Sequence, residues 1–308
     1  MDRNEWLEAR RKTITGTDVS AIAGLNPYRT ALDVYCDKLG LTEPQADNPA
    51  MEFGRRLESV IAEKYAEENG VKLIHGEFVS KDGWMGGTPD RLIEGVDRGL
   101  EIKTAGAFRA KDWGESGTDN IPEAYLCQIA WYMAICEKSE WDVAVLIGGQ
   151  DYRQYRLKRS LRLENRLIEL AQQFRERHLL TRTPPVIDGS KSASEYIRAM
   201  FPRDRSPEFL TSTPEISALV GDLILERQRS AEIELRVNEL ENKIKAAIGE
   251  APGISGEWGR ISWKAGKDAS KTDWKAVAAA LNAPKDIVEK YTTVSPAARR
   301  FLLTVNKQ

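Results

Sequence analysis

The stretch Thr88–Lys103, TPDRLIEGVDRGLEIK, decides the fold that the sequence predicts. Side chains alternate across a strand, so Glu101 and Lys103 share one face while their apolar neighbours turn toward a core. A glycine-containing turn at residues 95–99 brings the second strand back beside Asp90. Two carboxylates on neighbouring strands repel each other unless a divalent cation neutralises them. The stretch therefore predicts a β-hairpin whose Asp, Glu and Lys side chains could hydrolyse a phosphodiester.

The tripeptide Glu-x-Lys is weak evidence by itself. Acid-x-Lys recurs at residues 241–243 and 273–275, where the sequence predicts no strand hairpin. A surface strand with polar residues facing water would give the same pattern. The Pro89-Asp90 pair and the turn that follows it make the 88–103 stretch more specific than Glu101–Lys103 alone.

The cysteines and histidines exclude several classes of site. Cys36, Cys127 and Cys136 form no C-x-x-C pair, which argues against a zinc knuckle, an iron–sulfur cluster and a disulfide scaffold. His75 and His178 are the only histidines, and no Ser or Cys lies in a nucleophile-elbow context. No P-loop occurs, so an ATP-driven motor is not expected.

Size and charge set further limits. With 308 residues and 34.6 kDa, the chain can form one large domain with an appendage, or two domains. It has no apolar run of about 18 residues and no apolar signal region at its start, so we expect a cytoplasmic protein with no membrane partner. The formal net charge of −2 gives no overall attraction to polyanions. Local basic clusters at residues 10–12 and 153–182 could contact DNA, although a solvated helix face explains the second cluster equally well.

The periodicity predicts a first region of alternating helices and strands. Helices are expected at 17–24 (capped by Thr17), 30–39, 52–69 and 123–136, and as a basic amphipathic segment ending near 180. Strands are expected at 72–80, in the 88–103 hairpin, at 141–147 and at 150–158. The 52–69 helix should bury an apolar stripe of Phe53, Leu57, Val60, Ile61 and Tyr65.

A Pro/Ser/Thr-rich stretch at 183–214 marks a linker between a first domain, 1–182, and a C-terminal region, 215–308. The C-terminal region should contain one long helix over 216–248 and a small α/β module with a strand at 257–264 and a helix at 274–281. The apolar seam of the long helix fits packing on its own domain as well as an intermolecular coiled coil.

Two further residues could complete the site. Glu58 borders the apolar stripe of the 52–69 helix, where a carboxylate needs a partner. An ion pair with Arg55 or Lys64 would satisfy it, and so would a place beside the predicted carboxylate pair. Gln128 shares one helix face with a tyrosine on either side, and its amide could orient a phosphate or a water, although most buried glutamines bond backbone groups.

An ordered set of motifs closely resembles the YqaJ-like phage recombinase exonucleases, the phage lambda exonuclease type of the restriction-endonuclease-like PD-(D/E)xK superfamily. The matching motifs are Arg11, Thr15–Asp18, Ala21–Tyr28, Phe53–Glu58, Gly87–Asp90, Glu101–Lys103 and Tyr125–Gln128. The resemblance covers residues 10 to about 180, and the ordered set is specific where single motifs are not. The family usually has Ser where Thr17 stands, a change that preserves the hydroxyl.

The resemblance implies a fold, an activity and partners. The fold would be α/β, a restriction-endonuclease-like core of mixed sheet flanked by helices. The activity would be Mg²⁺-dependent 5′-to-3′ hydrolysis of linear duplex DNA that leaves a 3′ single strand, with Mn²⁺ as a substitute cation. The partners would be double-stranded DNA ends, a single-strand annealing protein and other copies of the chain in a ring-shaped trimer. The setting would be the cytoplasm of a bacterial host, with a phage or prophage as the source.

The same resemblance assigns roles to residues of the matching motifs. Asp90, Glu101 and the backbone carbonyl of Ile102 would be metal ligands, with Glu58 next to a second metal or bound through water. Lys103 would orient or help deprotonate the attacking water, Gln128 would help place it, and Arg11 and Thr17 would bind a 5′-phosphate. A structure-guided endonuclease of the same fold and a non-catalytic DNA-binding or annealing module remain alternatives at this stage.

Overall fold

The computed structural model describes residues 2–41, 48–266 and 272–293. The chain divides into two compact units, residues 1–202 and 203–308. The boundary falls inside the stretch predicted to be a linker, 183–214. Part of that stretch forms a helix, α7 (Lys191–Met200), whose Tyr196 packs edge-on against Tyr35 with ring centroids 6.2 Å apart. The first unit therefore continues beyond residue 182.

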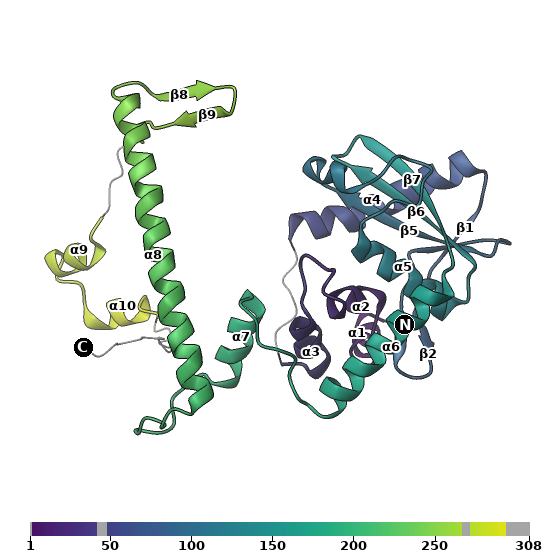
Figure 1. Cartoon of the computed structure of the whole chain (residues 1–308), viewed down its shortest axis with the longest axis horizontal. Helices are drawn as coiled ribbons and strands as arrows, with labels where there is room; N and C mark the ends of the chain where they lie inside the picture. Colours follow the sequence, from purple (N-terminus) through teal and green to yellow (C-terminus); the bar gives the residue numbers. More distant parts are fainter. Residues whose placement is uncertain (1, 42–47, 267–271, 294–308) are drawn as a thin grey trace. The chain divides into compact units, whose positions relative to one another are not determined.

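A five-stranded mixed sheet forms the centre of the first unit (Figure 1). In spatial order its strands are β1 (Leu73–His75), β4 (Arg91–Ile93), β5 (Arg98–Ala105), β6 (Glu140–Ile147) and β7 (Asp151–Lys158). β5 and β6 run parallel, and the other neighbouring strands are antiparallel. The hairpin predicted from the sequence is β4–β5, with Arg91 opposite Leu100. The prediction of an α/β fold with a mixed sheet flanked by helices is confirmed.

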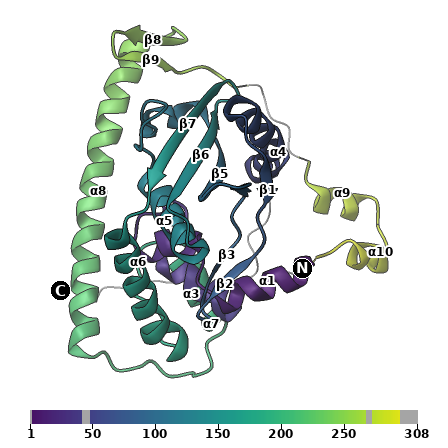
Figure 2. The ribbon, with the colours of Figure 1, turned by 90° about the vertical axis from the view of Figure 1, so that its right-hand side faces the viewer.

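Two helices cover opposite faces of this sheet, α4 (Pro49–Asn69) and α5 (Glu123–Cys136) (Figure 2). Apolar residues of α4 pack against Leu100 and Ile102 of β5. Since side chains alternate along β5, Glu101 takes the opposite face, where α5 lies. The sheet thus places Leu100 and Ile102 on the α4 side and Glu101 on the α5 side.

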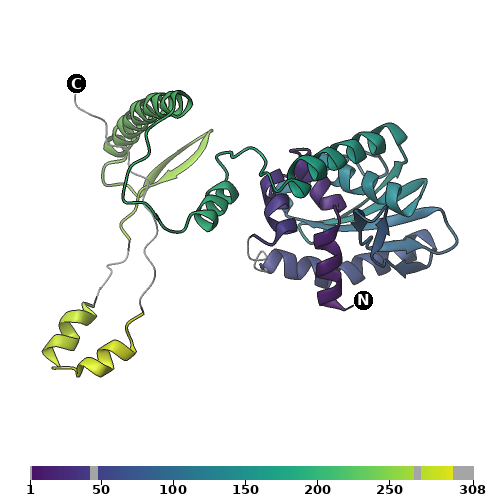
Figure 3. The same cartoon turned by 90° about the horizontal axis from the view of Figure 1, so that it is seen from below.

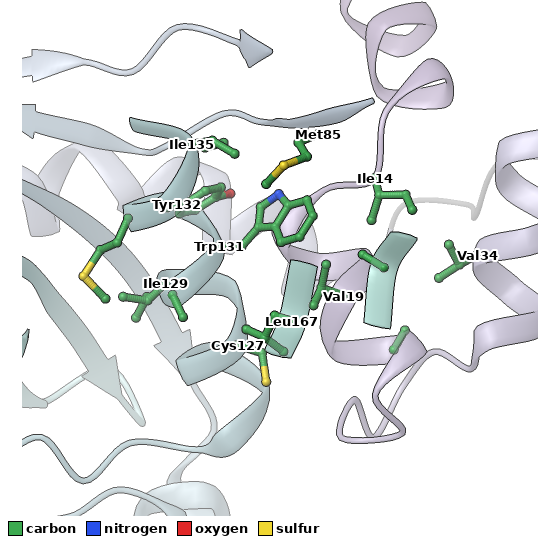
Figure 4. Close-up of a cluster of buried hydrophobic side chains, with 14 of the residues drawn as sticks. Ile14, Val19, Val34, Met85, Cys127, Ile129, Trp131, Tyr132, Ile135 and Leu167 are labelled. Carbon is green, nitrogen blue, oxygen red and sulfur yellow. The ribbon is translucent and has the colours of Figure 1, made fainter. Parts of the chain in front are cut away.

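Further helices of the first unit form one packed group with α5. They are α1 (Arg3–Lys12), α2 (Gly16–Ile22), α3 (Ala31–Leu39), α6 (Leu161–Phe174) and a π-helical turn at Arg175–Leu180. Figure 4 shows Ile14, Val19, Met85, Trp131 and Leu167 converging in the core between these elements. All residues of α5 from Cys127 to Ile135 are buried, so the helix that carries Gln128 is held on every side.

The strand predicted at 72–80 is instead two strands in different sheets. β1 joins the main sheet, and β2 (Val79–Lys81) pairs with β3 (Met85–Gly87). The break falls at Gly76, where a Cβ atom would lie 1.8 Å from the carbonyl oxygen of Pro89. The Gly76 N–H donates to the carbonyl oxygen of Asp90 at 3.2 Å. The chain therefore crosses the Pro89–Asp90 backbone at a distance that only glycine allows.

A buried ionic cluster ties α2 to α3. Asp18 is fully buried, and its Oδ2 accepts the backbone N–H of Thr15 at 2.9 Å and pairs with Lys38 Nζ at 2.6 Å. Its Oδ1 accepts a hydrogen bond from Arg29 at 3.1 Å. Burial alone would raise the pKa of Asp18, but the two cations and the hydrogen bonds lower it to about 2. The cluster fixes the start of α2.

Two local predictions on the helices are wrong. The short helix begins at Gly16 and its N-cap is Thr15, so Thr17 lies inside the first turn. Threonine occurs at positions 13, 15 and 17, and each could cap a helix. The sequence alone does not show which of the three Asp18 bonds. On α4, Phe53 and Val60 are 60% and 56% exposed, whereas Leu57, Ile61 and Tyr65 of the predicted stripe pack on the sheet.

The second unit contains the long helix α8 (Pro214–Ile248), the strands β8 (Gly253–Gly256) and β9 (Gly259–Ser262), and the helices α9 (Trp274–Ala280) and α10 (Lys285–Lys290) (Figure 3). The predicted strand at 257–264 contributes only its middle, because β8 and β9 form a tight antiparallel hairpin. In the described part of the chain, no helix has the length and apolar character needed to cross a membrane.

Candidate active site

The β4–β5 hairpin brings Asp90 to the side of β5. Asp90 precedes β4, and its Oδ2 accepts the backbone N–H of Ile102 at 2.7 Å. Glu101 and Lys103 flank Ile102 on the same strand. The sequence prediction that Asp90, Glu101 and Lys103 lie together at one end of a hairpin agrees with this geometry.

Glu101 is the most enclosed group of the site, with 1% of its surface exposed. Its Oε1 accepts a hydrogen bond from Gln128 Nε2 at 2.8 Å and forms an ion pair with Lys103. Its Oε2 is also buried, yet no hydrogen-bond donor within the described residues reaches it. A buried carboxylate oxygen without a partner is costly, and it marks a place where a further positive group fits.

The electrostatics of the three groups are coupled. Burial and the nearby negative charge of Asp90 raise the pKa of Glu101 to about 8. Burial also raises the pKa of Asp90, with a further contribution from Glu58. Burial would lower the pKa of Lys103, but the carboxylates of Glu101 and Asp90 raise it above its ordinary value. The site holds more negative charge than Lys103 can neutralise.

Gln128 connects the site to the core of the unit. Its Nε2 donates to the hydroxyl of Tyr132 at 3.1 Å as well as to Glu101, and Tyr132 donates to the carbonyl oxygen of Thr88 at 3.1 Å. A Cβ atom on Gly16 would lie 3.0 Å from Gln128 Cγ, so α2 packs directly on this part of α5. These contacts hold the amide in one orientation.

Glu58 reaches the site from α4 and has a partner that the sequence analysis did not name. Its Oε1 accepts a hydrogen bond from Arg91 Nη1 at 2.6 Å, and the same Nη1 donates to the carbonyl oxygen of Asp90 at 2.6 Å. Lys64, one of the two partners expected for Glu58, pairs with Glu68 instead. Because the charge of Glu58 raises the pKa of both Asp90 and Glu101, the expected place beside the carboxylate pair also agrees with the structure. The position of Arg91, directly after Asp90, was the available sequence signal.

The two residues expected to bind a 5′-phosphate lie on separate helices. Arg11 is exposed in the last turn of α1, and Thr17 is half-buried in the first turn of α2. No hydrogen bond joins them in the described structure. The N-terminal turn of α2 is already bonded through Thr15 and Asp18, so their role as a phosphate site stays a prediction.

The carboxylate side chains alone do not make a complete set of metal ligands. No group of three His, Cys, Asp or Glu side chains suited to hold a metal ion occurs among the described residues. What is present is a pair, Asp90 and Glu101, with the backbone of Ile102 between them. Both the N–H and the C=O of a strand residue point to the same side, so the Ile102 carbonyl faces Asp90 as its N–H does.

The sequence is similar to a known domain and to a known protein. Residues 5–139 match the model of the YqaJ-like viral recombinase domain. The uncharacterized protein YqaJ of Bacillus subtilis (strain 168) is 28% identical over 271 residues, which cover 86% of this chain and 84% of that protein.

Solved structures with similar folds have lower sequence identity. An alkaline exonuclease, LHK-Exo, from Laribacter hongkongensis is 20% identical, with a TM-score of 0.46, and the match covers 58% of this chain and 96% of that one. A putative exonuclease from Eubacterium rectale is 11% identical, with a TM-score of 0.46, over 71% of this chain and 97% of that one. Residues 5–139 of this chain are thus similar to the YqaJ-like viral recombinase domain, and most of the chain is similar to the Bacillus YqaJ protein.

Proposed function

We propose that the chain is a divalent-metal-dependent exonuclease that acts on linear duplex DNA. The observation that carries the proposal is the pair of the half-buried Asp90 and the buried Glu101 beside Lys103, in a part of the chain that matches a viral recombinase domain. A carboxylate pair with an adjacent ammonium is suited to phosphodiester hydrolysis and has no evident structural need to be buried together.

The donor set fits a hard cation such as Mg²⁺. Glu101 Oε2 is buried, and no hydrogen-bond donor in the described part of the chain reaches it. Burial, with a smaller contribution from neighbouring carboxylates, raises the pKa values of Asp90 and Glu101, and a bound cation would stabilise the charged forms of both. Asp90, Glu101 and the Ile102 carbonyl would hold the ion, Glu58 would contribute from α4 as a second-metal ligand or through water, and Mn²⁺ should substitute. Bound there, the cation would lower the pKa of a water and stabilise charge on the leaving oxygen.

The chain's own residues have distinct tasks in this proposal. Lys103 has a raised pKa and therefore remains an ammonium, which favours donating hydrogen bonds to the water or the scissile phosphate over accepting a proton. Gln128 fixes the carboxylate of Glu101 and, through Tyr132, ties it to the backbone just before Asp90. Arg91 holds Glu58 and the Asp90 carbonyl in one place.

The direction of digestion is the finer part of the proposal. We assign a 5′-phosphate contact to Arg11 and Thr17, which would start hydrolysis at 5′ ends and leave a 3′ single strand. The exposed guanidinium of Arg11 can bind a phosphate bidentately. The proposed site is the last turn of α1 together with the first turn of α2, joined by only the short stretch 13–15.

The viral recombinase domain supports a role in phage-type recombination by single-strand annealing. The 3′ strand would pass to a single-strand annealing protein, the enzyme would work in the cytoplasm of a bacterial host, and the nuclease units would assemble as a trimer around DNA.

One assay separates the proposal from its rivals. The purified chain is incubated with Mg²⁺ and equal amounts of blunt linear duplex, covalently closed circular duplex and linear duplex with 5′-hydroxyl ends. An exonuclease degrades the linear forms from their 5′ ends, with 5′-phosphorylated ends preferred, and spares the circle. Cutting of circles as fast as linear DNA would indicate an endonuclease of the same fold. Binding without any metal-dependent hydrolysis would indicate a non-catalytic DNA-binding or annealing module.

A further inference from the structure

Helix α8 carries a heptad repeat along most of its 35 residues, a length of about 52 Å. Core positions a are Ile216, Leu223, Ser230, Val237 and Ile244, and core positions d are Leu219, Glu226, Ile233, Leu240 and Ala247. Apart from the polar pair Ser230 and Glu226 near the middle, these residues are apolar. A repeat of 3.5 residues sustained over four heptads is typical of a coiled coil.

The seam formed by these positions is open within its own unit. Leu219, Ile233 and Leu240 are 62%, 65% and 45% exposed. A long helix with an uncovered apolar seam gains most of its stability from packing against a partner. The charges that flank the seam indicate which partner.

In a parallel, in-register pair of identical helices, each g residue faces the e residue five positions later on the other helix. For α8 the facing pairs are Asp222 with Arg227, Arg229 with Glu234, and Arg236 with Glu241. All three pairs are opposite in charge, and the twofold symmetry of the pair repeats each of them. The flanking charges are therefore complementary to a second copy of the same helix.

The antiparallel arrangement is less complementary. There g residues face g residues and e residues face e residues. Overlap of the full seam gives the opposite-charge pairs Asp222 with Lys243 and Arg227 with Glu234, but it sets Arg229 of one copy against Arg236 of the other, twice by symmetry. Like charges at these positions disfavour the arrangement. Within one helix Arg229 pairs with Glu226 and Arg236 with Glu239, but these pairs are exposed and hold the guanidinium groups only weakly.

The identity of the core residues sets the number of strands. β-Branched residues stand at three of the five a positions, Ile216, Val237 and Ile244, and leucine stands at two of the five d positions, Leu219 and Leu240, while Leu223 at a and Ile233 at d are the opposite choice. This distribution favours two strands. We propose that α8 forms a parallel, in-register, two-stranded coiled coil with α8 of a second copy of this chain, an association through a different surface from the trimer proposed for the nuclease units. The polar Ser230 and Glu226 near its middle weaken the core and help to fix the register.

Cysteine cross-linking in the full chain tests the register directly. Leu240→Cys places a thiol at a d position, and Asn242→Cys places one on the outer f position as the matched control. In the parallel pair the two thiols introduced at position 240 face each other, so mild oxidation should give a disulfide-linked dimer on a non-reducing gel. In the antiparallel pair residue 240 would face residue 223, about 25 Å along the helix from its counterpart. The wild-type chain controls for Cys36, Cys127 and Cys136, of which the first two are buried.

A linked dimer for Leu240→Cys with none for Asn242→Cys supports the proposal. Absence of the Leu240→Cys product overturns it, whether the seam is covered by the chain's own first unit or by an antiparallel copy. Equal cross-linking at both positions also overturns it, because random collision would then explain both products.

Charge exchange tests the pairing in the same Leu240→Cys background. Arg236→Glu should slow cross-linking about tenfold, since two attractive pairs become repulsive. Adding Glu241→Arg restores opposite charges across the parallel interface and should restore the rate. Failure of the double exchange to recover cross-linking would contradict the in-register pairing. Neither readout depends on nuclease activity.

Discussion

The Ile102 N–H donates to Asp90 Oδ2 across 2.7 Å, one residue from Glu101. Ile102 lies beyond the last paired residues of β4 and β5. Its N–H is therefore bonded by the Asp90 side chain and not by a backbone carbonyl of β4. The bond sets the distance between the two carboxylates of the site. The position of Asp90 therefore depends on the backbone around Pro89, which is where Gly76 makes its close approach.

Gly76→Ala should damage the site without touching a catalytic group. The added Cβ would meet the Pro89 carbonyl oxygen, which is backbone and cannot rotate away, so the Pro89–Asp90 segment must shift. We expect a loss of about 2 kcal/mol in the free energy of unfolding and a drop in hydrolysis rate of at least about tenfold. Gly106→Ala is the matched control, since a Cβ there meets nothing within 4 Å. If Gly76→Ala left both the free energy of unfolding in urea and the rate of hydrolysis unchanged, the close contact between Gly76 and the Pro89 carbonyl would be contradicted.

Lys103→Ala should lower the rate of hydrolysis about a thousandfold in saturating Mg²⁺, because the ammonium beside the carboxylates is lost from the transition state. Lys64→Ala removes an ammonium that pairs with Glu68 on α4 and lies over the ring of Tyr152, and it should leave the rate unchanged. Initial rates on a short linear duplex measure both. A Lys103→Ala rate within a few-fold of the control would remove this residue from the mechanism.

The Asp18 cluster predicts a defined pH dependence of stability. The pKa of Asp18 is lowered from 3.8 to about 2 by folding, so its contribution is fully present above about pH 4 and is lost as the pH falls toward 2. The stability difference between the wild type and Asp18→Asn should therefore shrink by about 2 kcal/mol between pH 5 and pH 2. Urea unfolding across this range measures the difference. If the difference in the free energy of unfolding stayed constant between pH 5 and pH 2, folding would not lower the pKa of Asp18.

Arg11→Ala tests the proposed 5′-phosphate contact. It should reduce the preference for 5′-phosphorylated over 5′-hydroxyl ends, while hydrolysis of 5′-hydroxyl duplex falls less than about twofold, because the guanidinium contacts only the terminal phosphate. Arg3→Ala, at the opposite end of α1, is the control for a general loss of positive charge. An equal decrease on both kinds of end would assign Arg11 to general DNA binding instead.

Local signals in the sequence were sufficient for the elements that carry the site. The strict alternation at 100–103 and the glycine turn predicted the β4–β5 hairpin, and Pro122 with the apolar run that follows predicted α5 at 123–136. Gly70 predicted the end of α4, and it adopts the left-handed conformation with φ of 61°. These signals depend on nearest neighbours in the chain, which sequence reasoning can evaluate.

The relationships that failed depend on tertiary packing. The Glu58–Arg91 pair joins α4 to β4 across 33 residues, so helix spacing could only suggest partners on α4 itself. The choice of Thr15 over Thr17 as N-cap depends on Asp18, whose burial among Lys38 and Arg29 is a property of the folded unit. The split of the 72–80 strand depends on the crossing at Gly76, which alternation alone does not reveal.

Glu101→Gln is the most direct test of the central claim, that the carboxylate pair Asp90 and Glu101 is the site of metal-dependent DNA hydrolysis. The substitution keeps the shape of the side chain and removes its charge. The free energy of unfolding, measured in urea, should therefore be within about 1 kcal/mol of the wild-type value or higher than it. The account predicts that the wild type degrades linear duplex in Mg²⁺, that chelation stops it, and that Glu101→Gln is slower by about a thousandfold or more. A folded Glu101→Gln protein that degrades linear duplex at close to the wild-type rate in Mg²⁺ would contradict it.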